Sequence, residues 1–78
     1  MDVKVLGSGC RNCLNTAEII TAKAAELGVP VTVEKVTDFA AIAGYGVMRT
    51  PGVVIDGKVV HAGGVPSADD VARWLTGA

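Results

Sequence analysis

Cysteine, histidine and aromatic residues are scarce in this chain of 78 residues. It has two Cys, one His, one Trp, one Tyr and one Phe. So few cysteines exclude a small secreted scaffold held together by several disulfides. With hydrophobic residues at 50 % but aromatics at 4 %, a packed core must be built mainly from Val and Ala. The longest stretch free of charged and amide side chains, residues 39–48, is about ten residues, too short for a membrane span of roughly 20.

Charge of one sign does not accumulate anywhere in the sequence. Seven Lys and Arg stand against eight Asp and Glu, which gives a net charge of −1. The basic residues are scattered, so we expect neither a nucleic-acid partner nor a membrane surface. The chain starts directly in a strand-like segment without the pattern of a signal peptide, which favours a cytoplasmic location. Residues 1–78 are expected to form one domain, and nothing in the sequence requires more than a monomer.

Hydrophobic periodicity predicts an α/β domain with the order β-α-β-α-β-β-α. Apolar residues recur at helical steps of three and four at positions 13, 17, 20, 24 and 27, and Gly28 and Pro30 end that helix. Asp56-Gly57 between two β-branched runs indicates a hairpin with a type I′ turn. The predicted strands are residues 2–6, 31–36, 53–55 and 58–60. The predicted helices are residues 10–27, residues 39–43 after an N-cap at Asp38, and a third that starts after Ser67 and ends at Gly77.

The two cysteines, separated by Arg11 and Asn12, take different places in the helical pattern. Cys13 belongs to the apolar stripe and should face the core. Cys10 follows the Gly7-Ser8-Gly9 turn and should face solvent, where the free N–H groups of the helix start lower the pKa of its thiol. A disulfide between them closes a loop of four residues and stabilises the fold by about 2 kcal/mol at most. The pair is therefore better suited to redox exchange or metal binding than to cross-linking.

Three uses of this pair are open from the residues alone. As a redox couple, Cys10 attacks a disulfide and Cys13 resolves the mixed disulfide. As a soft-metal site, two sulfurs suffice for copper(I), whereas a closed zinc site needs four ligands. The segment of residues 7–13 is similar to the metal loop of copper metallochaperones, although that family has the order β-α-β-β-α-β. As a third possibility, the domain is an interaction module whose cysteines have lost their role.

A combination of motifs in the second half favours the redox reading. Thr50-Pro51 precedes the strand pair, and Gly63-Gly64 and an acidic helix start follow it. Together with the Cys-x-x-Cys turn, this arrangement resembles the thioredoxin/glutaredoxin superfamily. It is most similar to the very short thioredoxin-like redox-active disulfide proteins of bacteria and archaea, over residues 3–75. The resemblance implies a minimal thioredoxin-like fold, a four-stranded mixed sheet of order 2-1-3-4 with helices on both faces.

The resemblance also assigns roles to individual residues. It implies that Cys10 is the nucleophile, Cys13 the resolving cysteine and Pro51 a cis-proline beside the disulfide. The remaining candidates for substrate binding are Thr50, whose backbone would pair with the substrate chain, Arg11, Gly63 and Gly64. The implied activity is that of a thiol–disulfide oxidoreductase acting on disulfide-containing proteins. Its electron donor would be a thioredoxin-reductase-type flavoprotein or a low-molecular-weight thiol, with no metal or organic cofactor.

Several positions depart from the family pattern. Gly9 replaces the aromatic residue common before the first cysteine, and Arg-Asn replaces Gly-Pro between the cysteines. In the interior of the first strand, Lys4 is the one charged residue, and no acidic residue stands there. These departures leave the reduction potential and the direction of electron flow open. Glutaredoxins hold glutathione with Gly-Gly and an acid close behind it. Here the acids Asp69 and Asp70 come later, so glutathione binding is also open.

Other side chains that could bear a function are expected to be structural. His61 should end a strand, and Phe39 and Trp74 should be core residues rather than binding aromatics. Arg49, directly before Thr50-Pro51, could favour acidic partners.

Overall fold

The computed structural model describes residues 1–77 and has the predicted order of elements. The strands are β1 (Asp2–Leu6), β2 (Thr32–Val36), β3 (Gly52–Ile55) and β4 (Lys58–Ala62). The helices are α1 (Arg11–Leu27), α2 (Phe39–Gly44) and α3 (Ala68–Thr76). Each predicted element is present, with bounds that differ from the prediction by at most two residues.

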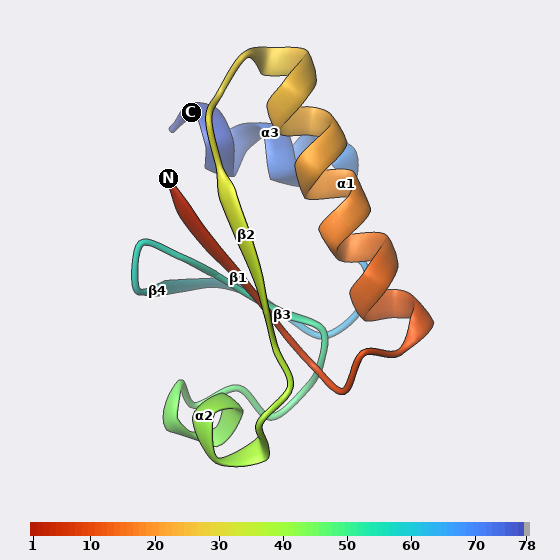
Figure 1. Cartoon of the computed structure of the whole chain (residues 1–78), viewed down its shortest axis with the longest axis vertical. Coiled ribbons are helices and arrows are strands. Elements are labelled where there is room, and N and C mark those ends of the chain that lie inside the picture. Colours follow the sequence, from red (N-terminus) through yellow and green to blue (C-terminus); the bar gives the residue numbers. More distant parts are fainter. Residues whose placement is uncertain (78) are drawn as a thin grey trace.

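The four strands form a mixed sheet of order β2-β1-β3-β4, as expected (Figure 1). β1 and β2 are parallel, and α1 supplies the crossover that a parallel pair requires. β3 runs antiparallel to both β1 and β4. Asp56 and Gly57 connect β3 to β4 with φ angles of 49° and 84°, and positive values at both central residues are those of a type I′ turn.

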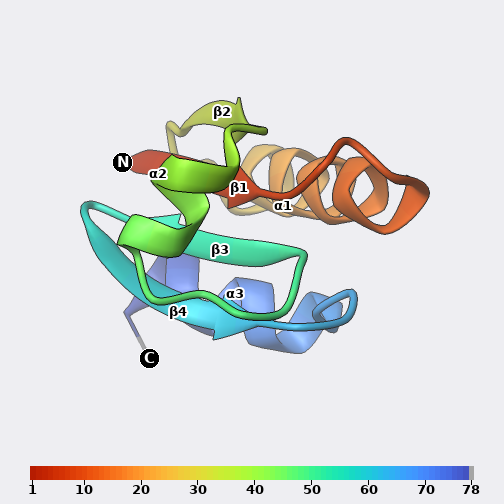
Figure 2. The ribbon, with the colours of Figure 1, turned by 90° about the horizontal axis from the view of Figure 1, so that it is seen from below.

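Helices cover both faces of the sheet. On one face α1 and α3 lie next to each other (Figure 1). Their apolar side chains pack on Val3, Val5, Val53 and Ile55. On the other face, the short helix α2 packs Ile42 against a smaller cluster of Leu6, Val47 and Val54. Figure 2 shows α2 on the opposite side of β1 and β3 from α3. Strand alternation explains this division, because successive side chains point to opposite faces.

Capping residues set the helix ends where the sequence predicted them. Gly28 ends α1 in the left-handed conformation, with φ 69°, and Gly77 ends α3 in the same way. The Ser67 hydroxyl accepts a hydrogen bond from the backbone N–H of Asp70, and the Asp38 carboxylate accepts one from that of Ala40. Within residues 1–77, no helix is both long and apolar enough to cross a membrane.

Two apolar side chains differ from their expected places. Phe39, predicted to lie in the core, is 87 % exposed. α2 has six residues and buries a single side chain, Ile42, so Phe39 in its first turn points away from the sheet. Leu27, the last member of the apolar stripe of α1, is 38 % exposed because it stands at the end of the helix. Trp74 is partly buried against the main core cluster, in line with its predicted role.

Candidate functional site

Cys10 and Cys13 lie at the start of α1, and their sulfur atoms are 3.3 Å apart. Cys10 is the N-cap residue, with extended backbone angles, and its carbonyl accepts the first helical hydrogen bond, from Leu14 N–H. Its thiol is exposed, whereas Cys13, one turn into the helix, is 5 % exposed and packs in the main core cluster. Both thiols are free. The helical phase thus produces the predicted difference in exposure between two adjacent sulfurs.

The backbone at the start of α1 lowers the pKa of the Cys10 thiol. The foremost cause is the backbone N–H of Cys13, followed by the Cys13 thiol and the N–H groups of Asn12 and Cys10 itself, while partial burial opposes the shift. The sulfur makes no capping hydrogen bond of ordinary geometry, so these N–H groups act on it as oriented dipoles. They stabilise a negative charge at Cys10.

The pKa of Cys13 moves in the opposite direction. Burial raises it most, and the neighbouring Cys10 sulfur raises it further. A buried thiol is costly to ionise because its anion loses contact with water. At a sulfur–sulfur distance of 3.3 Å, the protonated Cys13 thiol can donate to the Cys10 thiolate. The arrangement therefore favours one nucleophilic sulfur and one proton-bearing sulfur.

Gly7 makes this arrangement possible, and sequence reasoning treated it merely as part of a turn. A Cβ atom at Gly7 would overlap the Cys13 sulfur, and it would lie 3.5 Å from the Cys13 Cβ and from the Thr50 Cβ. Gly7 is buried, and its φ is not in the left-handed region, so the requirement is for space rather than for an unusual conformation. The sequence signal that could have identified Gly7 is its place directly after a buried strand. The same contact shows that Thr50 lies beside the buried cysteine.

The segment around Pro51 is the second part of the site. The Thr50–Pro51 peptide bond is cis, Pro51 is buried and Thr50 is exposed. The carbonyl of Pro51 accepts a hydrogen bond of 3.0 Å from the N–H of Gly63. A Cβ at Gly63 would lie 3.2 Å from the Cβ of Arg49. The structure therefore brings Thr50, Pro51 and Gly63 together.

The other predicted site residues have weaker connections to this group. Within residues 1–77, Arg11 makes no side-chain hydrogen bond or ion pair. Gly64 is exposed, and its carbonyl lies 2.9 Å from Nε2 of His61, which must be the donor because a carbonyl can only accept. The His61 ring also lies 5.6 Å from the Trp74 ring. His61 thus anchors the Gly63-Gly64 loop.

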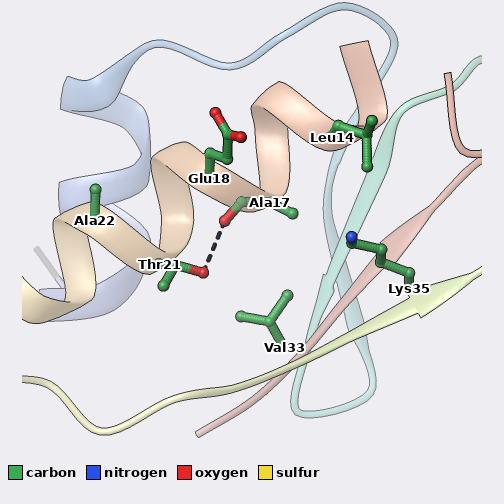
Figure 3. Close-up of a pocket in the computed structure, with 7 residues that line it drawn as sticks. All are labelled: Leu14, Ala17, Glu18, Thr21, Ala22, Val33 and Lys35. Atoms are coloured by element: carbon green, nitrogen blue, oxygen red, sulfur yellow. Dashed lines mark hydrogen bonds between the residues drawn. The ribbon is translucent and has the colours of Figure 1, made fainter. Parts of the chain in front are cut away.

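One groove of the described surface does not involve the cysteines. It measures about 520 Å³, lies between α1 and β2, and is lined by residues that include Leu14, Glu18, Val33 and Lys35 (Figure 3). A second groove of about 370 Å³ runs from α2 to Thr50 and Ser8. Neither cysteine lines that groove, and sequence analysis did not anticipate it.

The described residues offer few ligands for the alternative function, metal binding. In the described part of the chain, no group of three or more His, Cys, Asp or Glu side chains is arranged to hold a metal ion. A metal carrier would have to use the two sulfurs of Cys10 and Cys13.

Comparison with known proteins agrees with the geometry. A family model described as a thioredoxin domain matches residues 1–76. A thioredoxin from Methanocaldococcus jannaschii is 36 % identical over 73 residues, which cover 94 % of this chain and 84 % of that protein. A thioredoxin from Methanothermobacter thermautotrophicus is 28 % identical over 76 residues, covering 97 % of this chain and 99 % of that protein.

Proposed function

Because this chain belongs to the thioredoxin domain family, we propose that it is a thiol–disulfide oxidoreductase that uses Cys10 as nucleophile and Cys13 as resolving cysteine. Members of that family are in general thiol–disulfide oxidoreductases. The observation that carries the proposal is the pair of sulfurs 3.3 Å apart, one exposed and one buried. The opposite directions of their pKa shifts support the two roles.

The exchange proceeds in two steps. The Cys10 thiolate attacks one sulfur of the substrate disulfide, whose S–S bond breaks, and the other substrate sulfur leaves as a thiolate that takes a proton. Cys13 then loses its proton and attacks the Cys10 sulfur of the mixed disulfide, which releases the second substrate thiol. The substrate gains two electrons and two protons, and the protein is left with a Cys10–Cys13 disulfide. A thioredoxin-reductase-type flavoprotein or a low-molecular-weight thiol would return the electrons.

Substrate contact is proposed around Thr50. Thr50 is exposed, its Cβ lies near the space at Gly7 that adjoins the buried cysteine, and its backbone could pair with an extended substrate segment in the manner of an added strand. Pro51, Gly63 and Gly64 would shape this side of the site, and Arg11 would lie next to the attacking sulfur. The protein would act as a monomer on protein disulfides, in a reducing compartment such as the cytoplasm, where the dithiol form persists.

A trapping experiment tests the assignment of the two cysteines. Wild type, Cys10→Ser and Cys13→Ser are each mixed with a protein disulfide substrate such as insulin, and mixed disulfides are quantified by non-reducing mass spectrometry. Cys13→Ser should accumulate the mixed disulfide, because Cys10 still attacks and nothing resolves the product. Cys10→Ser should accumulate little, since its remaining thiol is buried. Equal trapping by the two variants would remove the assigned roles.

A further inference from the structure

The imidazole of His61 connects the core of the domain to the turn that follows β4. Its Nε2 lies 2.9 Å from the Gly64 carbonyl oxygen, and since that oxygen only accepts, the neutral ring carries its proton on Nε2. The centroid of the same ring lies 5.6 Å from that of Trp74 in α3. Trp74 packs against the main core cluster, so the histidine is held between the core and the turn.

The turn needs an anchor because both of its residues are glycines in the left-handed region. Gly63 has a φ of 88° and Gly64 a φ of 75°. Glycine adopts this conformation without strain, but it has no side chain to hold it there and loses much conformational freedom when it is ordered. Gly64 is also exposed, so packing restrains it little. The hydrogen bond from His61 therefore helps to fix the conformation of the turn.

Gly63 in turn contacts the residues on both sides of Thr50. Its N–H donates to the Pro51 carbonyl at 3.0 Å. A Cβ at Gly63 would lie 3.2 Å from the Cβ and 3.5 Å from the Cδ of Arg49, so the Arg49 side chain packs along this glycine. One residue of the turn thus restrains the chain both before and after Thr50.

On the basis of the proposed oxidoreductase activity, we propose that His61 is a positioning residue for reaction with polypeptide disulfides. Its Nε2–H fixes the Gly63-Gly64 turn, and the turn keeps the Thr50 backbone in the arrangement with which a substrate chain would pair. A segment that is ordered before binding loses less entropy on binding. Loss of the His61 donor should therefore slow reaction with a peptide disulfide. A small disulfide without a flanking chain makes no such pairing and serves as the reference.

Substitutions of His61 that differ in a single donor test this inference. The amide nitrogen of Gln is separated from Cβ by as many bonds as His Nε2, whereas that of Asn is one bond closer and takes the place of Nδ1. His61→Gln therefore keeps the donor and His61→Asn removes it. His61→Phe keeps an aromatic ring beside Trp74 without a donor. Lys58→Gln, at the exposed start of β4, is the control outside the contact.

Two measurements are made on each variant, at a temperature below the Tm of all of them. The value of kcat/KM with a disulfide-linked peptide is divided by that with bis(2-hydroxyethyl) disulfide. In His61→Asn and His61→Phe this ratio should fall about fivefold, which corresponds to about 1 kcal/mol, the usual net strength of one hydrogen bond. His61→Gln and Lys58→Gln should keep the wild-type ratio. Amide hydrogen exchange at Gly63, followed by NMR, should become faster in the same two variants, because its hydrogen bond to Pro51 opens more often.

Distinct results would overturn the two proposals. If His61→Gln behaves like His61→Asn, packing of the ring rather than the Nε2 donor is what matters, and the positioning role is wrong. Unchanged ratios in all variants, an equal fall in both rates, or a lower ratio without faster exchange at Gly63 would also overturn that role while leaving the oxidoreductase activity intact. Failure of wild type to react with bis(2-hydroxyethyl) disulfide would overturn the activity and, with it, the role of His61.

Discussion

Replacing Gly7 by Ala should disturb the site through one added carbon atom. The new Cβ would overlap the Cys13 sulfur and would contact the Cβ atoms of Cys13 and Thr50 at 3.5 Å. The backbone at Gly7 lies outside the left-handed region, so alanine has no conformational penalty there. The whole effect of the substitution therefore arises from crowding at the buried sulfur.

The crowding can be relieved in two ways, and each has a measurable cost. If the main chain shifts, overpacking in a tight core destabilises the protein by about 1–3 kcal/mol. For a domain of this size that corresponds to a fall in Tm of roughly 4–24 °C. If instead the Cys13 side chain rotates, its sulfur leaves the 3.3 Å contact with Cys10. Resolution of a mixed disulfide then slows, because ring closure must bring the sulfurs to about 2.05 Å.

Both outcomes are measured on the same protein. Thermal unfolding of the reduced form gives Tm, and stopped-flow kinetics with a peptide disulfide separates formation of the mixed disulfide from its resolution. Gly44→Ala is the matched control, because a Cβ there meets no atom within 4 Å. It should leave both kinetic steps unchanged and keep or raise Tm, since Ala is the better helix former. A Gly7→Ala protein with wild-type Tm and wild-type resolution rate would refute the packing argument.

Two further substitutions test the local structure, with the free energy of unfolding measured in urea. Gly57→Ala forces a Cβ into the left-handed region, at φ 84°, and should cost about 1–2 kcal/mol, whereas Gly57→Asn should cost less because Asn tolerates that region; equal costs would contradict the turn assignment. Ser67→Ala removes the acceptor of the Asp70 N–H and should cost about 1 kcal/mol, and Ser67→Asp should restore most of it. A neutral Ser67→Ala would show that the cap does not stabilise α3.

Local signals in the sequence were sufficient for the framework of the fold. The α1 stripe, the Asp56-Gly57 turn and the Ser67 cap each depend on interactions between residues close in the chain. The difference in exposure between Cys10 and Cys13 follows from the same helical period, so it too could be predicted. The strand order and the cis Thr50–Pro51 bond were expected from the family resemblance rather than from periodicity.

The features that escaped prediction depend on contacts between distant segments. Gly7 faces Cys13 only after β1 and α1 pack together, and no local pattern distinguishes it from an ordinary turn glycine. Phe39 was wrongly placed in the core because hydrophobicity alone does not say which side of a one-and-a-half-turn helix meets the sheet. The groove next to it combines Ser8 with side chains from residues 37–50, which lie far from it in the sequence. Such surfaces become visible when the whole chain is folded.

Alkylation rates of the two thiols as a function of pH test the central claim, the inequality of the two sulfurs, most directly. Iodoacetamide reacts with thiolates, so each rate falls as the pH drops through the pKa of that thiol. Cys10 in wild type should have its midpoint below that of a free cysteine. Cys13, measured in Cys10→Ser, should have its midpoint above it, because burial, the foremost cause, persists in the variant. Coincident midpoints, or a lower midpoint for Cys13, would contradict the account.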